Sequence, residues 1–127
     1  MEKGVINTNG APAAIGPYSQ AIKAGGFIFT SGQLPADPVS GGIVYGDIKK
    51  ATAQCIENII AIAKEEGCIL EDVVKTTIYI KNMDDFGAVN EVYGKYFDKN
   101  QPARSCIQVA KLPKDADIEI EAIICKG

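Results

Sequence analysis

The chain has 127 residues, a length typical of one domain whose core needs no metal or disulfide, so we expect a single domain over residues 1–127. Its 16 acidic and 13 basic residues give a net charge of −3, which argues against nonspecific nucleic-acid binding through a basic patch. Histidine is absent and the four cysteines are scattered, which excludes a Ser-His-Asp triad and argues against a structural zinc site.

The first third of the chain predicts a looped entry followed by a β-hairpin. Residues 1–17 are rich in Gly, Ala and Pro, and the polar start lacks the apolar region of a signal peptide, so we expect a cytoplasmic protein. No apolar run is long enough for a membrane span. Alternation predicts a strand over 18–24, and Gly25-Gly26 suits a two-residue turn into a second strand over 27–31.

The middle of the chain predicts two helices on either side of a strand. Apolar residues recur at helical spacing over 47–66, with Asp47 as a plausible N-cap and Gly67 just beyond the end. The β-branched segment 73–81 predicts a strand. A second, shorter apolar stripe then predicts a helix over 83–98.

Two more strands, over 103–110 and 117–125, are predicted to close the chain, and the connection 111–116 suits an antiparallel hairpin between them. The order is therefore β-β-α-β-α-β-β, an α/β (α+β) domain of one sheet and two helices. Two helices cover only one face of such a sheet, yet strands 27–31 and 103–110 carry apolar residues on both faces. We therefore expect the second face to be buried in a homo-oligomer.

Arg104 is the most informative residue for function, because it is the only arginine beside twelve lysines. A guanidinium presents a planar fork that matches a carboxylate or phosphate in two parallel hydrogen bonds. Strand alternation places Cys106 on the same face as Arg104, and it places Glu119 and Glu121 together on one face of the next strand. If these two strands form a hairpin, a guanidinium, a thiol and a carboxylate share one small patch.

This patch has two interpretations. It can be a cross-strand ion pair on a solvated sheet face. It can also be a site where Arg104 clamps an anionic substrate while a glutamate moves protons or positions water. Cys106 lacks the histidine that usually activates a thiol, so the sequence gives no reason to assign a covalent intermediate. Phosphate-loop, dinucleotide-binding and G-x-S-x-G motifs are also absent.

Five segments of the sequence, in order, resemble the RidA (reactive intermediate deaminase, YjgF-like) family: residues 13–20, 29–33, 75–77, 102–106 and 118–122. The resemblance runs from about residue 3 to the C-terminus. It implies a chorismate-mutase-like fold with one mixed sheet. It also implies a homotrimer in which the sheets pack into a central barrel and three ligand clefts lie between subunits.

The same resemblance implies an activity. Members of that family hydrolyse short-lived 2-imino acids, such as 2-iminobutanoate and 2-iminopropanoate, to 2-oxo acids and ammonia. No cofactor is expected, because a protonated imine is already electrophilic. A functional link to the pyridoxal-phosphate-dependent threonine and serine dehydratases, which release such compounds, is also implied.

The resemblance assigns roles to seven residues of this chain. Arg104 would hold the substrate carboxylate, and Glu119 would orient the attacking water and move protons. The remaining residues would contact the substrate or line the cleft: Tyr18, Ser31, Gly32, Asn90 and Cys106.

An alternative function remains open at this stage. Some relatives are linked to binding, regulatory, chaperone-like or endoribonuclease roles, so the same cleft would serve a trimeric 2-oxo-acid sensor. Glu119 favours catalysis, since a pure carboxylate binder gains little from a second negative charge nearby. The net charge of −3 and the single arginine weigh against RNA as the substrate.

Overall fold

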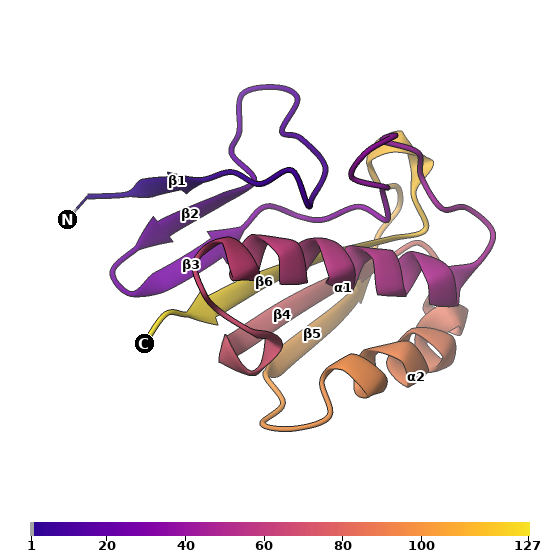
Figure 1. The fold of residues 1–127 in the computed structure, drawn as a ribbon. Coiled ribbons are helices and arrows are strands. Elements are labelled where there is room, and N and C mark those ends of the chain that lie inside the picture. Colours follow the sequence, from indigo (N-terminus) through magenta and orange to yellow (C-terminus); the bar gives the residue numbers. More distant parts are fainter. Residues whose placement is uncertain (1) are drawn as a thin grey trace.

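The computed structural model describes residues 2–127 as one mixed sheet with two helices against one face (Figure 1). The strands and helices, in chain order, are β1 (Gly4–Ile6), β2 (Ala21–Ala24), β3 (Phe27–Thr30), α1 (Ile48–Glu65), β4 (Val73–Ile80), α2 (Phe86–Tyr96), β5 (Ala103–Gln108) and β6 (Ile118–Cys125). The sheet order is β1-β2-β3-β6-β4-β5, and only β4 and β5 run parallel. The predicted fold class is confirmed.

The first helix follows the sequence prediction closely. The Asp47 carboxylate caps α1 by accepting a hydrogen bond from the Lys50 N–H at 3.1 Å. Gly67 lies just past the end with φ of +70°, the left-handed conformation that glycine adopts without strain. The apolar stripe of α1 is fully buried against the sheet, as in Cys55, Ile59 and Ile62. The spacing of these residues in sequence therefore fixed both the extent and the packing face of this helix.

The largest differences from the sequence prediction lie at β1 and at the starts of β2 and α2, and β5 ends at Gln108, two residues before the predicted end. The structure adds β1, which lies inside the predicted loop 1–17 and has only one buried residue, Ile6, too little for an alternating pattern. The predicted strand over 18–24 begins only at Ala21, so Tyr18 lies in the loop before β2. The second helix begins later than residue 83 because a 3₁₀ turn over Met83–Asp85 precedes α2.

The predicted hairpin between the last two strands is wrong. β4 lies between β5 and β6, pairing parallel with β5 and antiparallel with β6. The segment β4-α2-β5 is a strand–helix–strand crossover, which favours parallel pairing of neighbouring strands. The chain then passes a 3₁₀ turn at Pro113–Asp115 before β6 enters on the other side of β4.

The two faces of the sheet have different surroundings. Isoleucines such as Ile28, Ile78 and Ile120 lie on the helix-covered face and are fully buried. The opposite face carries Phe27 and Phe29, whose side chains are 40% and 45% exposed in the single chain. This uncovered apolar surface was expected, and the oligomer that would bury it stays a prediction. Within residues 2–127, no helix is long and apolar enough to cross a membrane.

Candidate functional site

The first part of the site forms where β3 leaves the sheet. The Thr30 hydroxyl accepts a hydrogen bond from the Ala122 N–H of β6 at 2.9 Å, in place of a backbone carbonyl. The chain returns to β6 at Gln33, which forms an isolated bridge. Ser31 and Gly32 therefore leave the pairing with β6, and Gly32 lies beside Glu119 near the start of that strand.

Gly32 and Glu119 come together at this step. A Cβ atom at residue 32 would lie 2.5 Å from Oε1 and 2.6 Å from Cδ of Glu119, so only glycine allows this approach. Partial burial, followed by the negative charge of Glu121, raises the pKa of Glu119. A carboxyl group with a raised pKa is suited to accept a proton and return it near neutral pH.

A hollow of about 570 Å³ lies against this carboxylate. Four of the residues predicted for the site line it: Tyr18, Ser31, Gly32 and Glu119. The remaining wall comes mainly from the loops before β2, after β3 and before β6, including Pro12, Ala13, Ile15, Leu34, Pro113 and Lys114. The structure therefore brings together the predicted residues of the N-terminal half of the chain with Glu119.

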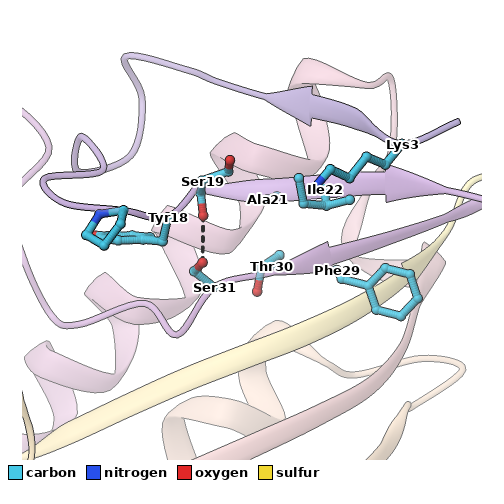
Figure 2. Close-up of a pocket in the computed structure, with 9 residues that line it drawn as sticks. Lys3, Tyr18, Ser19, Ala21, Ile22, Phe29, Thr30 and Ser31 are labelled. Carbon is cyan, nitrogen blue, oxygen red and sulfur yellow. Dashed lines mark hydrogen bonds between the residues drawn. The ribbon is translucent and has the colours of Figure 1, made fainter.

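A second hollow, of about 450 Å³, adjoins the first and shares Tyr18 and Ser31 with it (Figure 2). The Ser31 hydroxyl donates a 2.6 Å hydrogen bond to the Ser19 carbonyl, drawn as a dashed line in Figure 2. The Ser31 N–H donates to the Gln20 carbonyl at 2.8 Å. Both Ser31 donors are thus engaged within the chain, which leaves its hydroxyl oxygen as an acceptor for a ligand.

Two buried amide side chains hold the walls of the first hollow, and sequence reasoning did not identify them. Gln20 is 2% exposed and accepts from the Thr8 N–H at 2.7 Å. Its amide group also donates to three carbonyls of the entry loop, those of Thr8, Ala11 and Pro12. Gln20 therefore fixes the loop that carries Pro12 and Ala13.

Asn58 does the same for the loop after β3. It is fully buried in α1 and donates to the carbonyls of Leu34 and Ala36, each at 3.1 Å. Its own carbonyl oxygen accepts from Gln54 at 2.9 Å. The available sequence signal was an amide placed among the buried isoleucines of α1, such as Ile59.

The second part of the site surrounds Arg104 on the edge strand β5. Its Nη1 donates a 2.6 Å hydrogen bond to Oδ1 of Asn90 in α2. The guanidinium carbon lies 5.3 Å from the Phe86 ring centroid and 5.0 Å from that of Tyr93. Within residues 2–127 no carboxylate forms a salt bridge with Arg104, so the ion-pair interpretation is not supported.

Cys106 follows two residues later on the same face of β5 and is partly buried. Burial raises the pKa of its thiol, although the nearby Arg104 charge acts in the opposite direction. The thiol is therefore protonated at neutral pH, and a nucleophilic role gains no support.

The predicted single patch containing Arg104 and Glu119 is wrong within one subunit. Arg104 pairs with Thr76 of β4 on the helix-covered face, whereas Glu119 pairs with Tyr79 on the open face. β4 separates the two strands, and strand alternation sends the two side chains to opposite sides of the sheet. The predicted residues thus form two half-sites: Tyr18, Ser31, Gly32 and Glu119 in one, and Asn90, Arg104 and Cys106 in the other.

Comparison with known proteins shows the family to which the chain belongs. The sequence model of the endoribonuclease L-PSP family matches residues 8–126. The chain belongs to this family. A RutC family protein of Pyrococcus abyssi is 56% identical over 126 residues, covering 99% of each chain.

Two further family relatives bear on function. A mouse protein named 2-iminobutanoate/2-iminopropanoate deaminase is 48% identical over 123 residues, covering 97% of this chain and 91% of its own. The crystal structure of TdcF from E. coli with bound serine matches with a TM-score of 0.93 and 42% identity, covering 98% and 99% of the two chains. The expected resemblance to the RidA family is confirmed, and this family includes proteins named as imine deaminases.

Proposed function

We propose that the protein hydrolyses short-lived 2-imino acids, such as 2-iminobutanoate and 2-iminopropanoate, to 2-oxo acids and ammonia. The observation that carries this proposal is the chemistry of the two half-sites. One offers a guanidinium with no salt-bridge partner in residues 2–127, and the other offers a carboxyl group with a raised pKa beside a hollow. The name of the mouse relative agrees with this activity, and the serine in TdcF carries an α-carboxylate.

The complete cleft forms between two copies of the chain in a homotrimer. One copy supplies Tyr18, Gly32 and Glu119, and its neighbour supplies Asn90 and Arg104. Two observations support this arrangement: the half-sites lie on opposite faces of one sheet, and the open face exposes apolar side chains that an assembly would bury.

The reaction then needs orientation and one proton-transfer group. Arg104 binds the substrate carboxylate in two parallel hydrogen bonds and places C2 near Glu119. Glu119 accepts a proton from water while the water oxygen bonds to C2 of the protonated imine, and a carbinolamine results. The carboxyl group next protonates the nitrogen. The C2–N bond breaks as the hydroxyl proton passes to Glu119, releasing ammonia and the 2-oxo acid. Glu119 then gives this proton to the ammonia or to solvent, which restores its carboxylate for the next turnover.

Orientation and one acid–base group are enough to catalyse hydrolysis of this substrate. A protonated imine is already electrophilic, so the route requires no further activation of C2. A positioned acid–base group such as Glu119 accelerates a reaction by about 10²–10⁴-fold. Orientation by Arg104 lowers the activation barrier by several kcal/mol more, and the upper limit for such an effect is about 7–11 kcal/mol. Enzymes that release 2-imino acids from amino acids, such as pyridoxal-phosphate-dependent threonine and serine dehydratases, would supply the substrate.

Arg104→Lys tests the proposal. The parent protein should accelerate the decay of 2-iminobutanoate generated in situ, and Arg104→Lys should lose most of that activity because an ammonium cannot replace the planar fork. Lys99→Ala removes an exposed cation that belongs to neither half-site, and it should retain the parent rate. Equal rates for Arg104→Lys and the parent would overturn the assignment of the carboxylate clamp.

The competing functions give different results in the same experiment. A sensor would bind 2-oxobutanoate without changing the decay of the imine. The family that the chain belongs to is named for an endoribonuclease, so the parent should also be incubated with RNA. The net charge of −3 weighs against RNA cleavage. RNA cleavage abolished by Arg104→Lys, together with unchanged imine decay, would replace the deaminase proposal.

A further inference from the structure

Arg104 lies in a slot made by one helix. The ring centroids of Phe86 and Tyr93 in α2 lie 5.3 Å and 5.0 Å from the guanidinium carbon, which is within the range of a cation–π interaction. Asn90 lies between them in sequence and accepts a 2.6 Å hydrogen bond from Nη1. The spacing of the three residues, four and three apart, puts them on one face of α2.

Tyr93 differs from the other residues of this slot because its own side chain is fixed by contacts with Thr76 and Phe97. Its hydroxyl forms a 2.7 Å hydrogen bond with the Thr76 hydroxyl of β4. Thr76 is fully buried and Tyr93 is 6% exposed. The ring also stacks on Phe97, with centroids 4.4 Å apart. The hydrogen bond at the hydroxyl and the stacking along the ring leave the Tyr93 side chain little rotational freedom.

The position of Thr76 links this contact to the substrate clamp. Thr76 is the residue paired directly with Arg104 in the β4–β5 register. The Thr76–Tyr93 hydrogen bond therefore ties α2 to the sheet at the strand position where the Arg104 side chain begins. Thr76 therefore lies beside the backbone of Arg104 and also holds Tyr93, whose ring contacts the guanidinium.

We propose that Tyr93, held by Thr76, is a positioning residue that fixes the plane of the Arg104 guanidinium for a planar carboxylate. The identity of that carboxylate, as part of a 2-imino or 2-oxo acid, rests on the function proposed above. Asn90 uses one N–H of the guanidinium and leaves four donors for a ligand. The aromatic rings hold the guanidinium and leave its positive charge in place, whereas a carboxylate partner would neutralise that charge.

The expected effect follows from what each variant removes. Tyr93→Phe and Thr76→Val remove the same hydrogen bond and keep the slot, so each should weaken binding of 2-oxobutanoate by about 3- to 10-fold. Tyr93→Leu also removes the ring and should weaken binding by up to about 30-fold. The double variant Thr76→Val/Tyr93→Phe should bind no more weakly than either single variant, and additive losses would show that the two residues act separately.

Kinetics separate positioning from general destabilisation. The carboxylate is bound in both the ground state and the transition state, so weaker binding of this group should raise KM more than it lowers kcat. Tyr96→Phe is the matched control. Tyr96 lies in α2 like Tyr93, but its hydroxyl donates a 2.7 Å hydrogen bond to Glu57 of α1 and not to a residue beside Arg104. That control should leave both constants unchanged.

A direct readout uses the fact that Arg104 is the only arginine. Its Nε–Hε group gives a single resonance in a ¹H–¹⁵N spectrum, which needs no assignment among other arginines. In the parent we expect a ring-current shift and slow exchange with water. Tyr93→Phe and Thr76→Val should speed that exchange, and Tyr93→Leu should also remove much of the shift, whereas Tyr96→Phe should change neither.

Failure of this inference is distinct from failure of the proposed function. If Arg104→Lys abolishes turnover while Thr76→Val and Tyr93→Phe keep parent exchange, KM and affinity, the function stands and the positioning role is overturned. If the parent does not hydrolyse the imine, the deaminase proposal fails. The arginine resonance still decides the positioning role, because unchanged exchange in Thr76→Val and Tyr93→Phe refutes it regardless of turnover.

Discussion

Gly32→Ala should separate activity from stability more sharply than any other change in this chain. The added Cβ would lie 2.5 Å from the Glu119 carboxylate oxygen, whereas ordinary contacts begin at 3.4 Å. The backbone of Gly32 does not adopt a positive φ, so alanine fits the main chain. The carboxylate, at the free end of a side chain beside a hollow, is the group that must move.

The expected magnitude follows from this displacement. Relief of the contact requires a shift of about 1 Å, and a misplacement of that size costs roughly 10²-fold in rate. The free energy of unfolding should change by less than about 1 kcal/mol, because alanine also reduces the conformational freedom of the unfolded chain. The deaminase assay with 2-iminobutanoate measures the first quantity, and urea unfolding measures the second.

Gly4→Ala provides the matched control for this substitution. Its Cβ would meet Cε of Lys23 at 3.5 Å, an ordinary contact, and residue 4 lies in β1 and does not line the hollow against Glu119. Both variants should unfold like the parent, and only Gly32→Ala should lose activity. Full kcat/KM in Gly32→Ala would refute the assigned position of the Glu119 carboxylate, and a large loss of stability would show that Gly32 serves the fold instead.

Two further predictions concern the surroundings of Glu119 and the hollow. Burial and the Glu121 charge raise the pKa of Glu119, so activity that needs its ionised form should fall at a higher pH than for an ordinary glutamate. Glu121→Gln should move that acid limb of kcat/KM to lower pH, and an unmoved limb would exclude Glu119 as the titrating base. Asn58→Leu leaves the Ala36 carbonyl unpaired, while the Leu34 carbonyl keeps its bond from the Ala36 N–H, and should cost about 1–3 kcal/mol in urea unfolding. An unchanged free energy of unfolding would show that Asn58 does not hold this loop.

The helices and most strands were predictable from sequence because their signals are local. Asp47, Gly67 and the stripe containing Ile59 report the start, end and packing face of α1 without reference to distant residues. The partners of β5 and β6 depend instead on long-range pairing. The loop 111–116 looks like a hairpin connection by itself, yet β4 occupies the place between the two strands.

The sequence named candidate residues for the site but only part of their geometry. The structure brings Arg104 against Asn90 and Gly32 against Glu119, and the roles of these residues stay predictions. Alternation assigned each strand residue to a face correctly, but the relation between the faces required the order of the strands. The role of Gln20 was also hidden, because its hydrogen bonds all reach backbone carbonyls and an N–H of a loop with no pattern of its own.

The location of Arg104 and Glu119 on opposite faces has a consequence for inheritance as well as for chemistry. In the proposed trimer, each subunit takes part in two different clefts, once through each half-site. A subunit that lacks Arg104 and another that lacks Glu119 are both inactive alone, yet a mixed assembly joins the intact half of each. For equal and random mixing, about one quarter of the clefts regain both groups. Two defective gene copies would thus partly restore each other's activity.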